Sequence, residues 1–153
     1  MMKLAADVLA CLSGKTLVTA ESLTGGGIGA VLTAIPGSSA VYKGGVVSYT
    51  NWVKETVLGI SRETLAIHGA VSVQTAEEMA VGVRKLLRSD VAVSVTGLAG
   101  PGGDEFGNPV GTVCIGYSSD RESFAVRHHF TGDREAVRNQ TIRAALELVL
   151  DNS

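Results

Sequence analysis

The stretch VTAESLTGGGIGAVLTAI (residues 18–35) joins two apolar segments through a corner of serine, threonine and glycine. The segment KTLVTAE (15–21) that leads into the corner is strand-like, and GGIGAVLTAI (26–35) can form a helix opened by glycines. Such a corner can bind an anion through backbone N–H groups at the start of the helix. The same glycines can instead serve only to let the helix pack closely on the sheet. The stretch predicts a strand-to-helix unit and leaves these two roles open.

Two nucleotide-binding motifs can be tested against this region, and both fail. Gly25, Gly27 and Ala30 fit the dinucleotide fingerprint G-x-G-x-x-A. That fold also needs an acidic residue about 20 positions further on, and none follows Glu21 before Glu55. The segment SGKT lacks the first glycine of a P-loop, and its lysine precedes the strand instead of following it.

Outward from this unit, strand-like and helix-like segments alternate along the chain, which favours an α/β layered fold in a single domain over residues 1–153. The predicted strands are 15–21, 44–50, 90–97, 111–119 and 123–131. The predicted helices are 2–12, 26–35, 51–59, 61–69, 75–89 and 133–150. The last two strands can pair as a hairpin, so the sheet is predicted to be mixed. Thr75 and Glu78 fit a capping box, and Asp133 fits the N-cap of the last helix.

The composition excludes several classes of protein. Of the 153 residues, 45% are apolar and 18% are charged, and the formal net charge is −2. These values exclude global disorder and provide no broad basic surface for nucleic acid. Cys11 and Cys114 lie in apolar patterns and are predicted to be buried and unpaired. The histidines lack metal-ligand spacing, and no segment is typical of a signal peptide or membrane span, so we expect a cytoplasmic protein without a metal.

Polar side chains that could carry chemistry gather at predicted strand ends, where α/β proteins usually bind ligands. Ser22 ends the first predicted strand, Tyr49 ends the second, and Lys54 follows within the next helix. A serine near a lysine and a tyrosine suffices for amide hydrolysis, because a desolvated lysine can act as base and a tyrosine can relay protons. Backbone N–H groups of the glycine corner could stabilise the oxyanion. Ordinary turn chemistry and a solvated lysine would account for the same residues, so the pattern alone leaves both readings open.

Five motifs, taken together and in this order, resemble the carboxy-terminal domain of the competence/damage-inducible CinA family. They are AES-x-TGG (20–26), GSS (37–39), Y-x-x-x-x-K (49–54), TG-x-AGP (96–101) and GDR (132–134). The resemblance extends over nearly the whole chain. It implies a three-layer α/β/α sandwich with a mixed, mainly parallel sheet, and a homo-oligomer, with a dimer favoured.

Stand-alone members of this family are nicotinamide mononucleotide (NMN) deamidases of the PncC type. The resemblance therefore implies hydrolysis of the carboxamide of NMN to nicotinate mononucleotide and ammonia, a step in pyridine nucleotide recycling. It implies neither a metal nor an organic cofactor, and the charge and apolar patterns predict no nucleic acid or membrane partner. The alternative is a catalytically silent nucleotide-binding or interaction domain that has kept the pocket.

The matching motif positions supply the candidate site residues. The resemblance implies a catalytic group of Ser22, Ser39, Tyr49 and Lys54. It leaves open which serine attacks, and we favour Ser22 with Lys54 as base and Tyr49 as relay. The implied substrate-binding residues are Thr24, Gly25, Gly26, Thr96, Arg134 and Arg138. Among these, Arg134 would hold the phosphate, with Arg138 as the second candidate, because a guanidinium group can bind phosphate through two hydrogen bonds.

Overall fold

The computed structural model describes residues 1–153 and contains one five-stranded sheet in the order β2-β1-β3-β4-β5. The strands are β1 (Leu17–Glu21), β2 (Tyr42–Val47), β3 (Val91–Gly97), β4 (Thr112–Ser119) and β5 (Ser123–His129). β1 pairs in parallel with β2 and with β3, whereas β4 is antiparallel to both β3 and β5. All strands except β4 therefore point in one direction, and the predicted mixed, mainly parallel sheet is confirmed.

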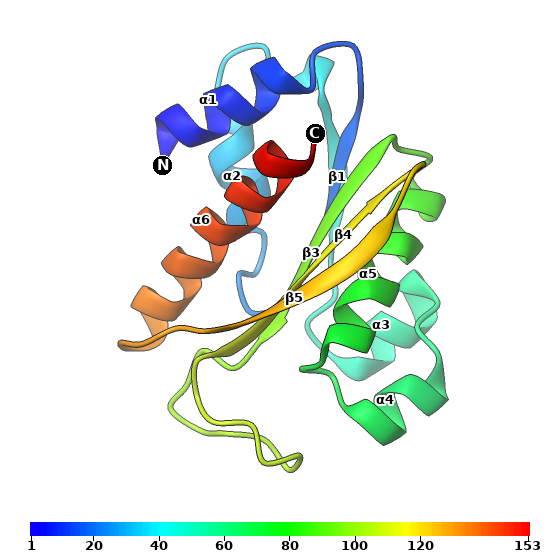
Figure 1. Ribbon diagram of the computed structural model, residues 1–153, viewed down its shortest axis with the longest axis vertical. Helices are drawn as coiled ribbons and strands as arrows, with labels where there is room; N and C mark the ends of the chain where they lie inside the picture. Colours follow the sequence, from blue (N-terminus) through cyan, green and yellow to red (C-terminus); the bar gives the residue numbers. More distant parts are fainter.

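Helices cover both faces of the sheet, as the three-layer prediction requires (Figure 1). One face carries α1 (Met2–Cys11), α2 (Gly27–Thr33) and α6 (Arg134–Asn152). The other face carries α3 (Asn51–Leu58), α4 (Arg62–His68) and α5 (Val73–Leu86). A short 3-10 helix, η1 (Ser38–Ala40), precedes β2. No helix combines the length and the apolar character that crossing a bilayer would require.

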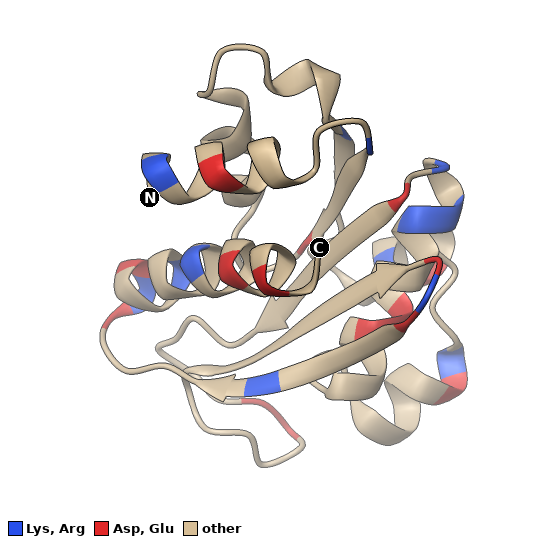
Figure 2. Ribbon diagram, turned by 45° about the horizontal axis from the view of Figure 1, so that its top comes forward, with Lys and Arg blue, Asp and Glu red and all other residues tan.

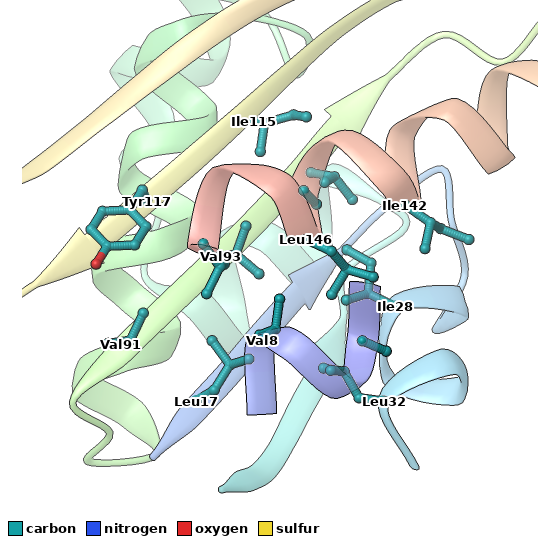
Figure 3. Close-up of a cluster of buried hydrophobic side chains, with 14 of the residues drawn as sticks. Val8, Leu17, Ile28, Leu32, Val91, Val93, Ile115, Tyr117, Ile142 and Leu146 are labelled. Atoms are coloured by element: carbon teal, nitrogen blue, oxygen red, sulfur yellow. The ribbon is translucent and has the colours of Figure 1, made fainter. Parts of the chain in front are cut away.

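The central strand β1 is buried along its whole length because it lies between the two helical layers. Side chains of a strand alternate between the faces of its sheet. Leu17 accordingly packs in the larger apolar cluster, under α1, α2 and α6, whereas Val18 and Ala20 pack in the smaller cluster, under α3, α4 and α5. Figure 3 shows the larger cluster, in which Val93 of β3 lies near Leu146 of α6. Each fully buried aliphatic side chain contributes roughly 1.5–3 kcal/mol, so these clusters fix the strands that end at the candidate site.

The register of the parallel strands aligns three hydroxyl residues at one edge of the sheet. Glu21, near the end of β1, pairs with Val47 of β2 and with Val95 of β3. The next residue of each strand or its continuation is Ser22, Ser48 and Thr96, respectively. This edge is the carboxyl edge of the parallel strands, where open α/β sheets bind their ligands.

The start of α5 differs from the prediction. Ser72 is the N-cap, and its Oγ accepts a hydrogen bond from the Thr75 N–H at 3.1 Å. Thr75 lies inside the helix, where its hydroxyl donates to the Gly69 carbonyl at 2.7 Å. Glu78 does not close a capping box, because its carboxylate accepts from the Ser61 N–H at 3.0 Å. The predicted capping box is therefore wrong, and the helix begins two residues before Thr75.

Two further local predictions have different outcomes. Asp133 caps α6 as predicted, accepting from the Ala136 N–H at 2.9 Å. Cys114 is buried as predicted, but Cys11 is exposed. The Cys11 prediction failed because this residue is the last of α1, where its thiol donates to the Ser153 carbonyl at 3.4 Å instead of packing in the core.

Candidate active site

Only two charged side chains are buried, that of Glu21, the residue before Ser22, and that of Lys54, whose amine contacts the Ser22 hydroxyl. Figure 2 shows the charged residues scattered over helices, loops and strands, with no continuous stripe of one sign. Removing a charge from water is unfavourable unless other groups compensate it. The end of β1, where both of these buried charges occur, is therefore a candidate for function.

Lys54 and Ser22 form a buried amine–hydroxyl pair, referred to below as the Ser22–Lys54 pair. Lys54 Nζ donates to Ser22 Oγ at 3.1 Å and to the Ser48 carbonyl oxygen at 2.7 Å. Burial lowers the pKa of Lys54 from 10.5 to about 8, because the charged form loses its hydration. A lysine with this pKa is partly neutral near pH 8 and can accept the proton of a neighbouring hydroxyl. Ser22 and Lys54, predicted from the sequence as nucleophile and base, thus lie in direct contact.

Local features of α3 place Lys54 against the end of β1. The hydroxyl of Thr50 caps the helix by accepting from the Val53 N–H at 3.4 Å. Gly59 ends the helix with φ +71°, a left-handed conformation that glycine adopts without strain. Before the helix, the Ser48 N–H donates to the Glu21 carbonyl at 2.8 Å, which ties the end of β2 to the end of β1. Lys54 therefore reaches a fixed partner across the carboxyl edge.

The carboxylate of Glu21 occupies the start of α2. Its Oε1 accepts from the Thr24 hydroxyl at 2.6 Å and from the Ile28 N–H at 2.8 Å, and its Oε2 accepts from the Gly29 N–H at 3.1 Å. A negative charge at a helix N-terminus is favourable, because the helix dipole is positive there. The chain's own carboxylate thus fills the position that an anionic ligand would take. The N–H groups of Ile28 and Gly29 are therefore already used within the chain, and the Thr24 hydroxyl donates to Glu21.

The glycines of the corner make the turn possible. Gly25 and Gly26 have φ +59° and +103°, in the left-handed region that favours glycine. The Gly25 N–H donates to the Ser22 carbonyl at 3.1 Å, so it is already used within the turn. The Gly26 N–H has no acceptor in the chain. Of the two predicted backbone donors, only Gly26 is therefore free.

Tyr49 and Arg134 lie together at the rim of the site. Tyr49 Oη accepts from Arg134 Nη2 at 3.2 Å, and Arg134 Nη1 donates to the Gly100 carbonyl at 2.7 Å. With Leu23 and the loop that begins at Gly97, they line a pocket of about 140 Å³. Tyr49 makes no hydrogen bond to the Ser22–Lys54 pair, so the predicted proton relay has no direct contact.

Arg138 and Thr96 contact backbone carbonyls instead of facing the pocket. Arg138 Nε donates to the Leu23 carbonyl at 3.0 Å, and its Nη2 donates to the Thr24 carbonyl at 3.2 Å. The Thr96 hydroxyl donates to the Ala70 carbonyl at 2.8 Å and is 1% exposed. Both side chains therefore hold the segments around the site in place, which differs from the ligand contacts predicted for them.

Ser39 lies away from the other predicted catalytic residues within one chain. It belongs to η1, just before β2 begins, and is exposed. This position is at the amino edge of the sheet, whereas Ser22 is at the carboxyl edge. The five residues of β1 between the two edges span about 17 Å. One chain therefore cannot bring Ser39 to the Ser22–Lys54 pair.

Two residues with clear roles in this geometry were not selected as site residues. Glu21 fixes the turn after Ser22, and the Ser48 carbonyl accepts from Lys54. A signal was present for Glu21, since an acidic residue at the end of an apolar strand is unusual. No sequence signal marks the Ser48 carbonyl, because every residue has a backbone carbonyl.

Comparisons with known proteins show the family of this chain. The family model of the CinA C-terminal domain matches residues 2–152. The nicotinamide-nucleotide amidohydrolase PncC of Escherichia coli (strain K12) is 47% identical over 135 residues, which cover 88% of this chain and 82% of that protein. A CinA-like protein of Endomicrobium trichonymphae is 45% identical over 150 residues, which cover 94% of this chain and 35% of that protein. The chain thus spans about a third of the length of relatives of this larger kind.

The fold is also found in solved structures. The crystal structure of the competence/damage inducible protein CihA from Agrobacterium tumefaciens matches with a TM-score of 0.95 and 40% sequence identity. The match covers 99% of this chain and 95% of that one.

Proposed function

The chain belongs to the CinA C-terminal domain family, and on that basis we propose that it hydrolyses the carboxamide of NMN to nicotinate mononucleotide and ammonia. The observation that carries the proposal is the Ser22–Lys54 pair, with 3.1 Å between Lys54 Nζ and Ser22 Oγ. Support comes from the relative in Escherichia coli, which is named a nicotinamide-nucleotide amidohydrolase and matches most of the chain.

In the proposed reaction, Ser22 Oγ attacks the carboxamide carbon while neutral Lys54 takes the hydroxyl proton. The π electron pair of the carbonyl moves onto its oxygen and forms the oxyanion. When the double bond re-forms, the C–N bond breaks, and Lys54 returns the proton to the leaving nitrogen so that ammonia departs. Water then attacks the ester with Lys54 as base, the bond to Ser22 Oγ breaks, and Ser22 regains its proton.

Arg134 is the proposed ligand of the substrate phosphate. It is exposed at the pocket rim, and a guanidinium group can bind phosphate through two hydrogen bonds. Tyr49, which accepts a hydrogen bond from Arg134, would contact the same end of the substrate. This arrangement would leave the pyridine end of NMN to the Ser22–Lys54 pair.

Ammonia release from NMN by the purified protein tests the proposal. We expect steady release by the wild type and none by Lys54→Met, because Met has a similar length but cannot accept a proton. Lys43→Met is the matched control, since Lys43 is exposed on β2 and its amine contacts only the Arg88 carbonyl. Wild-type protein that binds NMN but releases no ammonia would refute the proposal and support the silent nucleotide-binding alternative.

A further inference from the structure

Two backbone donors lie directly after the proposed nucleophile and lack partners. We propose that the N–H groups of Leu23 and Thr24 form the oxyanion hole and that Arg138 is the positioning residue that holds them. This inference rests on the proposed amidase function, because it assigns the groups that would stabilise the oxyanion formed at Ser22.

Neither N–H group has an acceptor within the chain. Leu23 and Thr24 are 4% and 0% exposed, so bulk water does not readily replace the missing partner. A buried N–H without an acceptor is rare in native proteins, because leaving one unpaired is unfavourable. Leu23 also lines the pocket beside Tyr49 and Arg134, so a ligand oxygen in that pocket would lie close to this turn.

The hydrogen bonds of the neighbouring carbonyls fix the directions of both donors. In a trans peptide, the carbonyl and the following N–H point in opposite directions. The Ser22 carbonyl accepts from the Gly25 N–H at 3.1 Å, which fixes the peptide that carries the Leu23 N–H. The Leu23 carbonyl accepts from Arg138 Nε at 3.0 Å, so the Thr24 N–H points away from Arg138. The two donors are therefore held before any substrate arrives, which is the property that an oxyanion hole needs.

The contacts of Arg138 distinguish it from Arg134. Its Nε and Nη2 both donate to backbone carbonyls of the turn, at 3.0 and 3.2 Å. It is partly buried on α6, whereas Arg134 is exposed at the pocket rim. Arg138 thus acts on the turn, and Arg134 remains the arginine that can reach a phosphate.

The test measures acylation of Ser22 by p-nitrophenyl nicotinate, an activated ester that carries no phosphate. Ser22 Oγ bonds to the ester carbonyl carbon, Lys54 takes the proton, and p-nitrophenolate leaves. Its release gives the rate, and the mass of the Ser22 peptide gives the position. We compare the wild type with Arg138→Met, Arg138→Lys and the matched control Arg143→Met, which removes an exposed arginine elsewhere on α6. For each protein we also measure kcat and KM with NMN, and the melting temperature.

We expect Arg138→Met to slow acylation roughly 10- to 100-fold. This is less than the loss of about 10²- to 10³-fold for an oxyanion donor that is removed outright, because the donors remain but are no longer held. With NMN, kcat should fall similarly while KM changes less than about twofold, and Arg138→Lys should recover part of the rate by holding one carbonyl. Arg143→Met should match the wild type.

Several outcomes would overturn the inference. Folded Arg138→Met that acylates at the wild-type rate would show that the turn does not need Arg138. A rise in KM for NMN with unchanged kcat would make Arg138 a phosphate ligand. Should Arg138→Met not fold, equal rates for Arg138→Lys and the wild type would also contradict it. Wild-type protein that acylates at Ser22 but releases no ammonia from NMN would refute the proposed substrate alone, and the ester rates would still decide on the oxyanion hole.

Discussion

Lys54 is 1% exposed, an unusual position for a lysine, since this residue type is almost never fully buried without partners. Its amine donates two hydrogen bonds, to Ser22 Oγ and to the Ser48 carbonyl, and no carboxylate forms an ion pair with it. Desolvation therefore dominates and lowers the pKa of Lys54 to about 8. A buried amine that loses its proton this easily is suited to act as a base.

The pH dependence of turnover follows from this pKa. The base must be neutral, and Lys54 is neutral above its pKa, so kcat/KM for NMN should rise about tenfold per unit below pH 8 and level off above it. Steady-state rates between pH 6 and 9.5 measure this profile, with Lys43→Met as the control that should keep it. A profile that is flat from pH 6 to 9 would mean that Lys54 is not the base.

Arg134→Met should weaken binding of NMN. Loss of hydrogen bonds to a charged group costs roughly 1.5–3 kcal/mol, so KM should rise about 10- to 100-fold while kcat stays near the wild-type value. The dephosphorylated riboside, which lacks the group that Arg134 binds, should show no such loss. Equal losses for NMN and the riboside would remove the phosphate role from Arg134, and Arg143→Met serves as the control on the same helix.

The sequence could select candidate residues by type and position, but it could predict few of their contacts. Ser22 and Lys54 were selected by motif and do meet, at 3.1 Å. Thr96 was selected by motif and Arg138 as the second candidate after Arg134, but they donate to carbonyls 26 and 115 residues away along the chain. Such partners depend on the packing of whole elements, which a local pattern does not contain.

At the scale of elements, the predicted helices and strands all exist, and most boundaries agree within a few residues. Gly59 and Asp133 mark helix ends that the sequence predicts, because each acts on residues close to it in the chain. Gly59 adopts a left-handed conformation, and the Asp133 side chain accepts from the Ala136 N–H. The start of α5 was missed because Ser72 and Thr75 are both suitable caps, and residue type alone does not choose between them. Both hydroxyls donate to the Gly69 carbonyl, but the Ser72 hydroxyl also accepts from the Thr75 N–H and so caps the helix.

Contact between α3 and α5 positions the base, and Gly82 makes it possible. A Cβ on Gly82 would collide with the Leu58 carbonyl oxygen at the end of α3. Alanine is intrinsically better than glycine in a helix, yet Gly82→Ala should destabilise the protein by about 1–3 kcal/mol because it forces the helices apart. It should also reduce kcat, since α3 carries Lys54. Urea unfolding and NMN turnover measure the two effects.

Gly102→Ala is the control for the stability measurement, because a Cβ there meets nothing within 4 Å. A Gly82→Ala variant that is as stable as the wild type or more stable would contradict this account of the helix contact.

At the scale of the whole molecule, sheet register assembles the site. The pairing of Glu21 with Val47 and Val95 sets Ser22 beside Ser48 and Thr96 at one edge, although these residues are far apart in sequence. The alternation of elements predicted a layered α/β fold, but no local pattern gives the strand order or register. The family resemblance predicted the three layers, whereas the alignment of the strand ends is visible only in the structure.

Ser39 provides a test at this scale, because it lies at the opposite edge from the Ser22–Lys54 pair. From the geometry of one chain, Ser39→Ala should keep kcat within about twofold of the wild-type value. A large loss would mean that a second copy supplies Ser39, as the predicted homo-oligomer would allow. Mixing inactive Ser39→Ala with inactive Lys54→Met would then restore activity, and sedimentation would give the number of copies.

If Ser22 Oγ attacks the carboxamide of NMN with Lys54 as its base, the reaction passes through a covalent ester on Ser22. The most direct measurement is the mass of the protein quenched within milliseconds of mixing with NMN, mapped to its peptides. We expect a nicotinate mononucleotide ester on the Ser22 peptide of the wild type. The Ser22→Ala variant should show neither this adduct nor turnover of NMN. An adduct on another residue, or continued ammonia release by Ser22→Ala, would contradict it.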